Sequence, residues 1–143
     1  MPKTFSAMGL EFLYPDNWVV QAESESENNP GVMLDLPSGG FFTLEPIESG
    51  QSIEVLVDQI AETFKDEYGE VEAEQLQLNT VDLPGVQLAV DYRFYYLDLL
   101  IISRLMFSEI SGRTFAIQFQ SESRDFEKNE LVINAILKQI ESI

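Results

Sequence analysis

Apolar residues recur at every second position along much of the chain, which is the spacing of a strand with one buried face. The clearest example is Val86–Tyr96, where one face would carry Val86, Leu88, Val90, Tyr92, Phe94 and Tyr96. Leu99–Phe107 is nearly apolar throughout, as expected of a strand covered on both faces. Six further segments are predicted strands: Leu10–Tyr14, Trp18–Ala22, Val32–Leu36, Phe41–Pro46, Glu72–Val81 and Arg113–Gln120.

Two other segments place apolar residues three and four positions apart, as amphipathic helices do. The first has the stripe Ile53, Leu56, Val57, Ile60, Ala61, Phe64 and Tyr68. Ser52 is a suitable N-cap for it, and Gly69 suits the position after its last turn. The second has the stripe Phe126, Ile133, Ile136, Leu137 and Ile140, with Ser123 as its expected cap.

The order is therefore four strands, a helix, four strands and a helix. Short connections within each group of strands favour antiparallel pairing. Pro15-Asp16 suits a type I turn in a first hairpin, Pro37–Gly40 suits a second, and Pro84-Gly85 suits a type II turn. We expect a single α+β domain over residues 1–143, with an antiparallel sheet of about six or seven strands between helical layers.

The charge of the chain restricts its partners. With 25 acidic and 8 basic residues the net charge is −17, which disfavours nucleic acid and anionic membrane surfaces. The chain has no His and no Cys, so a histidine general base, thiolate nucleophiles and the histidine and cysteine ligands of zinc are missing. No apolar run approaches the roughly 20 residues of a membrane span, and no secretory leader is visible, so we expect a cytoplasmic protein unless a leader was removed.

The element order, together with Phe12-x-Tyr14-Pro15-x-x-Trp18, resembles the PsbP-like superfamily. That superfamily includes the extrinsic photosystem II protein, the Ran-binding Mog protein and small bacterial proteins, and the bacterial branch fits best. The resemblance implies an α/β/α sandwich without a catalytic site or cofactor. Some of the bacterial proteins resemble dimeric chaperones of secreted toxins, which offers one binding hypothesis.

The hairpin formed by Val86–Tyr96 and Leu99–Phe107 can be paired from its turn. If Leu97-Asp98 is a two-residue turn, Asp91 faces Arg104 and Arg93 faces Ile102. Asp91 and Arg104 would then form a cross-strand ion pair that contributes roughly 0.2–1 kcal/mol. The alternative is that Arg93 and Arg104 bind a carboxylate or phosphate.

The end of this hairpin is unusually apolar. Two strands alone cannot bury so many large side chains, so either a helix covers them or they form a partner surface. The candidate surface residues are Arg93, Tyr95, Tyr96, Leu97, Leu99, Leu100 and Arg104.

Acidic residues provide two weaker hypotheses. Six of them surround the end of the first helix and could attract Ca²⁺, although they lack EF-hand spacing: Glu62, Asp66, Glu67, Glu70, Glu72 and Glu74. Two carboxylates at a fixed separation could also perform hydrolysis.

The sequence favours a non-enzymatic protein-binding or adaptor domain whose partner is another protein or a second copy of the chain. The alternatives are a cytoplasmic chaperone for a secreted effector, which needs an apolar groove, and a carboxylate-dependent hydrolase.

Overall fold

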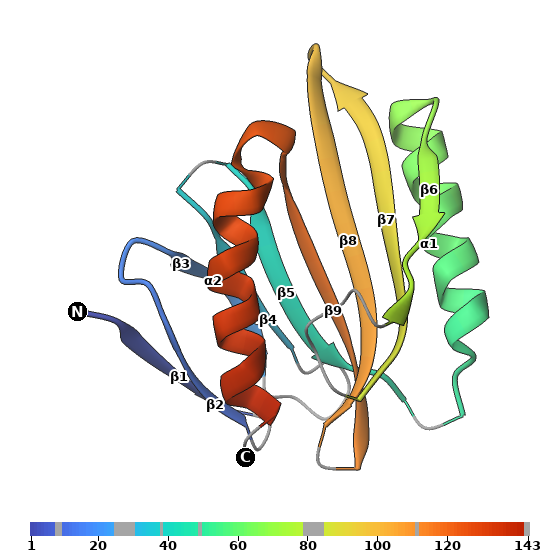
Figure 1. Ribbon diagram of the computed structural model, residues 1–143. Coiled ribbons are helices and arrows are strands. Elements are labelled where there is room, and N and C mark those ends of the chain that lie inside the picture. Colours follow the sequence, from blue (N-terminus) through green and yellow to red (C-terminus); the bar gives the residue numbers. More distant parts are fainter. Residues whose placement is uncertain are drawn as a thin grey trace.

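The computed structural model describes residues 1–7, 10–24, 31–37, 39–48, 50–78, 85–110 and 112–141. Within these ranges the chain forms nine strands and two helices, shown in Figure 1. In chain order they are β1 (Lys3–Ala7), β2 (Leu10–Tyr14), β3 (Val19–Ser24), β4 (Gly31–Asp35), β5 (Phe41–Pro46), α1 (Ile53–Tyr68), β6 (Glu72–Gln75), β7 (Val86–Tyr96), β8 (Leu99–Ile110), β9 (Arg113–Glu122) and α2 (Ser123–Glu141).

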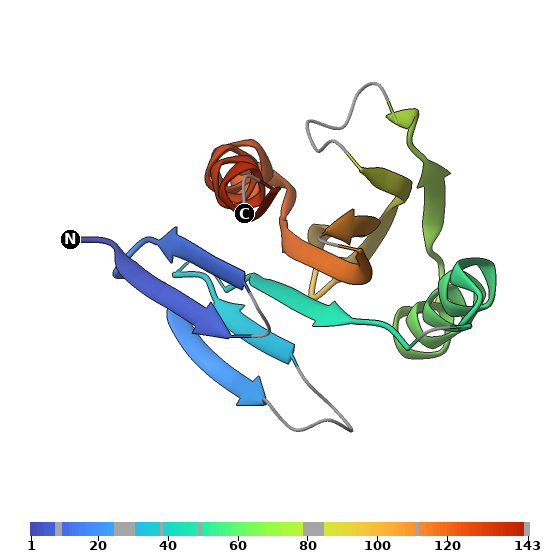
Figure 2. The same ribbon diagram turned by 90° about the horizontal axis from the view of Figure 1, so that it is seen from below.

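Seven strands form one sheet in the order β3-β4-β5-β9-β8-β7-β6, and every neighbouring pair is antiparallel. The two helices lie on opposite faces of it (Figure 2). The buried stripe of α2 packs against β2, β8 and β9, whereas α1 packs against β7. The predicted α+β sandwich, with a sheet of about six or seven strands, is therefore confirmed, and the sheet has seven.

The first predicted hairpin is wrong. A turn is present but shifted by one residue, because the Trp18 amide donates a hydrogen bond of 3.1 Å to the Pro15 carbonyl, which places Pro15 at the first position of the turn and not at the expected second. However, β2 pairs with β1 in a separate two-stranded sheet, and β3 pairs with β4 in the main sheet. Strand β1 was not predicted because Phe5 is the only large apolar residue in Lys3–Ala7, which leaves no alternating pattern to detect.

The aromatic residues around that turn join the small sheet to the main one. Phe12, Tyr14 and Trp18 are buried, and the Phe12 ring lies 6.5 Å from the Phe42 ring of β5 in an edge-to-face arrangement. From the other side, the Gln139 side chain of α2 accepts a hydrogen bond of 2.8 Å from the Leu13 amide. The chain therefore crosses from the small sheet to the main sheet at this turn, between the contact with β5 and the contact with α2.

Strand β7 departs from simple alternation at its first residue. Leu88, Val90, Tyr92 and Phe94 pack toward α1 as predicted, but Val86 packs with the core on the opposite face. The register with β8 shifts between Val86 and Leu88, and such a shift reverses the face of the preceding side chain. The prediction that all six alternating residues share one face is therefore wrong at Val86.

Other boundaries also differ from the prediction. The Ser52 N-cap of α1 is confirmed, because its hydroxyl accepts a 3.4 Å hydrogen bond from the Val55 amide, and Gly69 ends the helix with φ 83°. Ser123 is the first residue of α2 rather than its cap. β6 ends at Gln75, short of the predicted Val81, and residues 79–84 lie outside the described ranges.

Gly40 fits the sheet only because it has no side chain. A Cβ atom there would lie 2.2 Å from the backbone oxygen of Gln120 on β9. We expect Gly40→Ala to lower the free energy of unfolding by about 1–3 kcal/mol, because neither backbone can move without disturbing the sheet. Urea unfolding followed by Trp18 fluorescence measures the change.

The matched control is Gly31→Ala on β4. A Cβ atom there would meet the Glu45 Cβ at 3.2 Å, a contact that a shift of a few tenths of an ångström between the two strands relieves. We expect this control to lower the free energy of unfolding by less than about 1 kcal/mol. Equal losses for the two variants would contradict the proposed backbone clash at Gly40.

Candidate functional site

The hairpin of β7 and β8 closes at a two-residue turn. Tyr96 pairs with Leu99, and the turn residues Leu97 and Asp98 have φ angles of 50° and 66°. Two positive φ angles are what a type I′ turn requires. The predicted register is confirmed, since Asp91 lies opposite Arg104 and Arg93 opposite Ile102.

Leu97 is a poor residue for this backbone conformation. The left-handed region costs residues other than glycine roughly 1–2 kcal/mol, and asparagine and aspartate tolerate it best. Leu97 is also 78% exposed, so burial of its side chain does not offset the cost. The stability of the fold alone would favour asparagine at this position.

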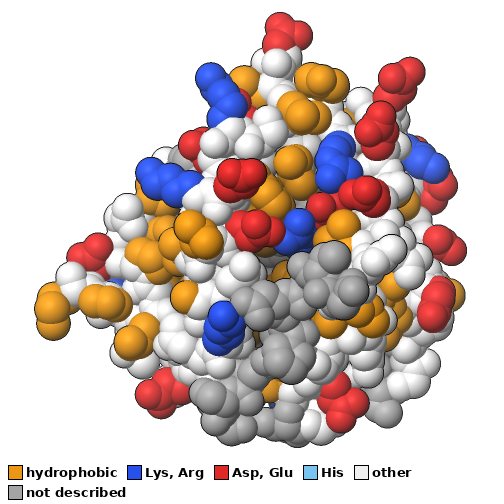
Figure 3. Space-filling view, in the orientation of Figure 1, with side chains coloured by type: hydrophobic (Ala, Val, Ile, Leu, Met, Phe, Trp, Pro, Cys, Tyr) orange, Lys and Arg blue, Asp and Glu red, His pale blue; other side chains and the backbone are white. Residues whose placement is uncertain are grey.

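Large apolar side chains gather around this turn. Tyr95 is 67% exposed, Tyr96 53% and Leu99 39%, whereas Leu100 is partly buried. Figure 3 shows hydrophobic side chains at the projecting end of the hairpin, at the top of the view. We call Tyr95, Tyr96, Leu97, Leu99 and Leu100 the tip surface. Among the residues that the structure describes, the other exposed large apolar residues lie on separate elements or segments: Met1, Leu13, Val19, Val55, Leu78 and Leu131.

One side of the tip surface is held by α1. The Tyr68 ring, near the end of that helix, stacks on Phe94 at 4.2 Å and meets Tyr96 edge-to-face at 5.8 Å. Partial burial raises the pKa of the Tyr68 phenol, and the hydrogen-bonded Glu67 carboxylate raises it further. Because side chains alternate along β7, Tyr95 points to the other face of the sheet. The helix therefore supports the tip surface without covering it.

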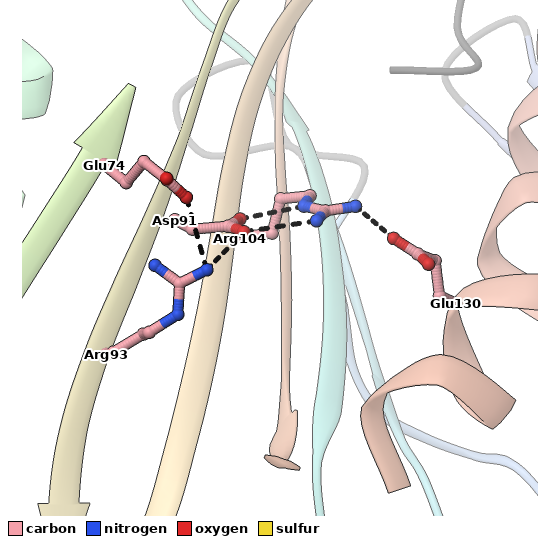
Figure 4. A network of polar contacts seen from close by, with 5 residues as sticks. All are labelled: Glu74, Asp91, Arg93, Arg104 and Glu130. Carbon is pink, nitrogen blue, oxygen red and sulfur yellow. Dashed lines mark hydrogen bonds and ion pairs between the residues drawn. The ribbon is translucent and has the colours of Figure 1, made fainter. Parts of the chain in front are cut away.

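Arg104 is fixed by two carboxylates (Figure 4). Its Nε donates a 2.8 Å hydrogen bond and its Nη2 a 3.2 Å hydrogen bond to the two Asp91 carboxylate oxygens, and Nη1 pairs with Glu130 of α2. Burial lowers the pKa of the guanidinium, but hydrogen bonds and attraction from Asp91 and Glu130 outweigh burial and raise it. The predicted cross-strand ion pair is confirmed, and it also ties α2 to the sheet.

Arg93 belongs to the same network. Its Nη2 lies 3.3 Å from a Glu74 oxygen on β6 and 3.7 Å from an Asp91 oxygen. Asp91 therefore contacts both arginines, and its side chain is only 3% exposed. An anion bound at Arg93 or Arg104 would have to displace these carboxylates, so the geometry favours a structural role for both arginines.

Sequence reasoning missed Glu74 and Glu130 as members of this network. The turn identified Asp91 and Arg104 because hairpin register follows from the turn. Glu130 comes from α2, whose docking position is not encoded in any local pattern. The one hint in the sequence is that Glu130 follows Phe126, a residue of the buried stripe, by one helical turn. In the structure the Arg104 guanidinium lies 5.1 Å from the centre of the Phe126 ring.

The acidic cluster at the end of α1 faces solvent. All six of its predicted members are exposed. Among the residues that the structure describes, no group of three or more acidic side chains is arranged to hold a metal ion. Glu74 instead pairs with Arg93.

The hydrolase hypothesis requires two acids close together. Glu45 on β5 is an exposed residue, but partial desolvation raises the pKa of its carboxyl, which is one property of a general acid. Its neighbours across the sheet are Gly31 on β4 and Ala116 on β9. Neither strand neighbour supplies the second carboxylate.

Neither described helix has the length and apolar character needed to cross a membrane.

No protein-family model matches the chain, and no curated protein sequence matches it. Solved structures do resemble it. Cyanobacterial PsbP from Synechocystis sp. PCC 6803 aligns with a TM-score of 0.57 at 14% identity, covering 96% of this chain and 90% of that one. A protein of unknown function from Pseudomonas aeruginosa, PA94, aligns with a TM-score of 0.49 at 15% identity, covering 91% and 89%.

LpqN of Mycobacterium tuberculosis, a protein involved in cell envelope biogenesis, aligns more weakly, with a TM-score of 0.42 at 12% identity, covering 97% of this chain and 88% of that one. At these identities the likeness concerns the fold alone. The comparison of folds rests here on the cyanobacterial structure, which aligns with a TM-score of 0.57. Together with the observed sheet order and the two helical layers, it shows that this chain has a PsbP-like fold.

Proposed function

We propose that the chain is a non-enzymatic protein-binding or adaptor domain that contacts its partner through the tip surface. The observation that carries the proposal is the concentration of exposed apolar side chains on one projecting turn, with Tyr95 67% and Leu97 78% exposed. Exposed apolar clusters mark interaction sites more often than isolated apolar residues do. Tyrosine is also enriched at interfaces, because its ring is apolar and its hydroxyl remains hydrated.

The backbone of the turn gives independent support. Leu97 combines a positive φ angle with high exposure, so the cost of its backbone conformation is not offset by burial of its side chain in the isolated fold. A bound partner that buries the Leu97 side chain would recover part of that cost. Strained backbone residues cluster at active sites, ligand clamps and switch regions.

The test is affinity capture from the native host, comparing the wild-type chain with the double variant Tyr95→Ser with Leu97→Ser. We expect the double variant to lose a protein that the wild type captures reproducibly, or to lose self-association in sedimentation velocity if the partner is a second copy. The control is Leu131→Ser on α2, which removes a side chain that is also 74% exposed. Unchanged capture and unchanged oligomeric state in the double variant would refute the proposal.

A single substitution at the turn separates stability from binding. We expect Leu97→Asn to raise the free energy of unfolding by about 1 kcal/mol, because asparagine suits the left-handed conformation. The same variant should bind its partner less well, because an apolar contact is lost. Urea unfolding and capture efficiency are measured on the same preparation. A variant that is stabilised and binds as well as the wild type would show that Leu97 is not a contact.

A further inference from the structure

The tip surface lies beside the most acidic stretch of the chain. Figure 1 shows the C-terminal end of α1 and the start of β6 next to the end of the β7–β8 hairpin. From Ile53 to Gln75 the only basic residue is Lys65. The acidic residues in this stretch, all of them exposed, are Glu54, Asp58, Glu62, Asp66, Glu67, Glu70, Glu72 and Glu74.

A direct contact joins the apolar and acidic parts. Tyr68 touches Tyr96 of the tip surface, and the adjacent Glu67 carboxylate raises the pKa of the Tyr68 phenol. Glu70 follows two residues later, and exposed Asp98 occupies the turn itself. The apolar side chains of the tip are therefore bordered by carboxylates on the α1 side and at the apex.

We propose that the partner of this surface is a basic amphipathic polypeptide segment. The inference rests on the proposed function and specifies the class of partner. Apolar side chains of the segment would cover Leu97 and Leu99, while its Lys or Arg side chains would lie against Glu67 and Glu70. A cation can also rest on the exposed Tyr95 ring, an interaction worth about 0.5–1 kcal/mol at exposed sites.

Charge complementarity selects this partner over a second copy of the chain. Two copies would each bring a net charge of −17, and pairing through the tip would place two acidic ends of α1 near each other. Like charges brought together at an interface oppose association. Arg93 does not neutralise them, because it is already paired with Glu74 and Asp91.

The experiment uses fluorescence anisotropy of three labelled peptides with the full chain. In the first peptide lysine alternates with leucine, in the second glutamate replaces lysine, and in the third serine replaces leucine. We expect saturable binding of the Lys/Leu peptide only. Its affinity should fall as salt rises from about 0.01 M to about 0.15 M, because the Debye length shortens from about 30 Å to about 8 Å.

Two variants locate the binding on the chain. Tyr95→Ser with Leu97→Ser should weaken the Lys/Leu peptide about tenfold or more, and Glu67→Gln with Glu70→Gln should have a similar effect. The charge-matched control is Glu11→Gln with Glu109→Gln, two exposed strand residues away from the tip. This control should change the affinity less than about twofold, because it alters the same net charge at remote positions.

The results also separate this inference from the proposed function. Equal weakening by both pairs of glutamate substitutions would mean nonspecific attraction to an acidic protein and would overturn the inference. Preference for the Glu/Leu peptide, or no saturable binding of the Lys/Leu peptide, would overturn it as well. In each case the capture experiment with Tyr95→Ser and Leu97→Ser still decides whether the tip binds a protein.

Discussion

Replacing Asp91 by alanine is expected to lower the free energy of unfolding by about 3–5 kcal/mol, the range for breaking a buried ion pair from one side. The Asp91 side chain is 3% exposed and contacts two arginines. Its removal leaves Arg104, 17% exposed, with Glu130 alone. A guanidinium that is largely desolvated and has lost one of its two carboxylate partners lowers the stability of the folded state. Urea unfolding with Trp18 fluorescence as the probe measures the loss.

Two controls separate the ion pair from simple truncation. Glu74→Ala removes a 58% exposed partner of Arg93, and surface pairs contribute about 0–1 kcal/mol, so its cost should be small. The double variant Asp91→Leu with Arg104→Met removes both charges from the interior and should recover most of the stability lost in Asp91→Ala. If the double variant is no more stable than Asp91→Ala, the loss does not come from an unpaired Arg104.

The main sheet could be predicted because its strands carry their own signals. Alternating residues in β7 and β9 and the two-residue turn at Leu97-Asp98 fixed both the faces and the register. Local sequence patterns did not predict the features that tertiary packing determines. β1 has a single large apolar residue, and the bulge near Val86 follows from pairing with β8. The pairing of β2 with β1 in a separate sheet, in place of the expected hairpin with β3, likewise depends on long-range contacts.

The tip surface was predictable as a group of residues but not as an exposed surface. Apolar residues at the end of a hairpin can be covered by a neighbouring helix, and α1 does cover Phe94. How far α1 reaches along the hairpin depends on where the helix ends. Gly69 ends it next to Tyr68, whose ring reaches Tyr96 but leaves it 53% exposed. Sequence supplied both termini of this helix, but only the packing showed which side chains remain uncovered.

Phe12→Ala is expected to cost about 3–5 kcal/mol of unfolding free energy, the range for truncating a fully buried phenylalanine. Phe12 is 1% exposed, and its ring lies 4.9 Å from Phe5 of β1 and 6.5 Å from Phe42 of β5. It is therefore one of the buried side chains through which the two-stranded sheet contacts the main sheet. Hydrogen exchange should consequently accelerate most in β1 and β2, whose amides depend on that contact.

The matched control lies one residue away. Leu13→Ala changes the opposite face of β2, where the side chain is 47% exposed, and should cost less than about 1 kcal/mol. Uniform acceleration of exchange in Phe12→Ala would show that the small sheet does not open separately from the rest of the fold. Accelerated exchange confined to β1 and β2 would instead show that the Phe-x-Tyr-Pro-x-x-Trp segment connects two sheets that open separately. This structural role accounts for the burial of its aromatic residues. The tip of β7 and β8 therefore remains the better candidate for binding.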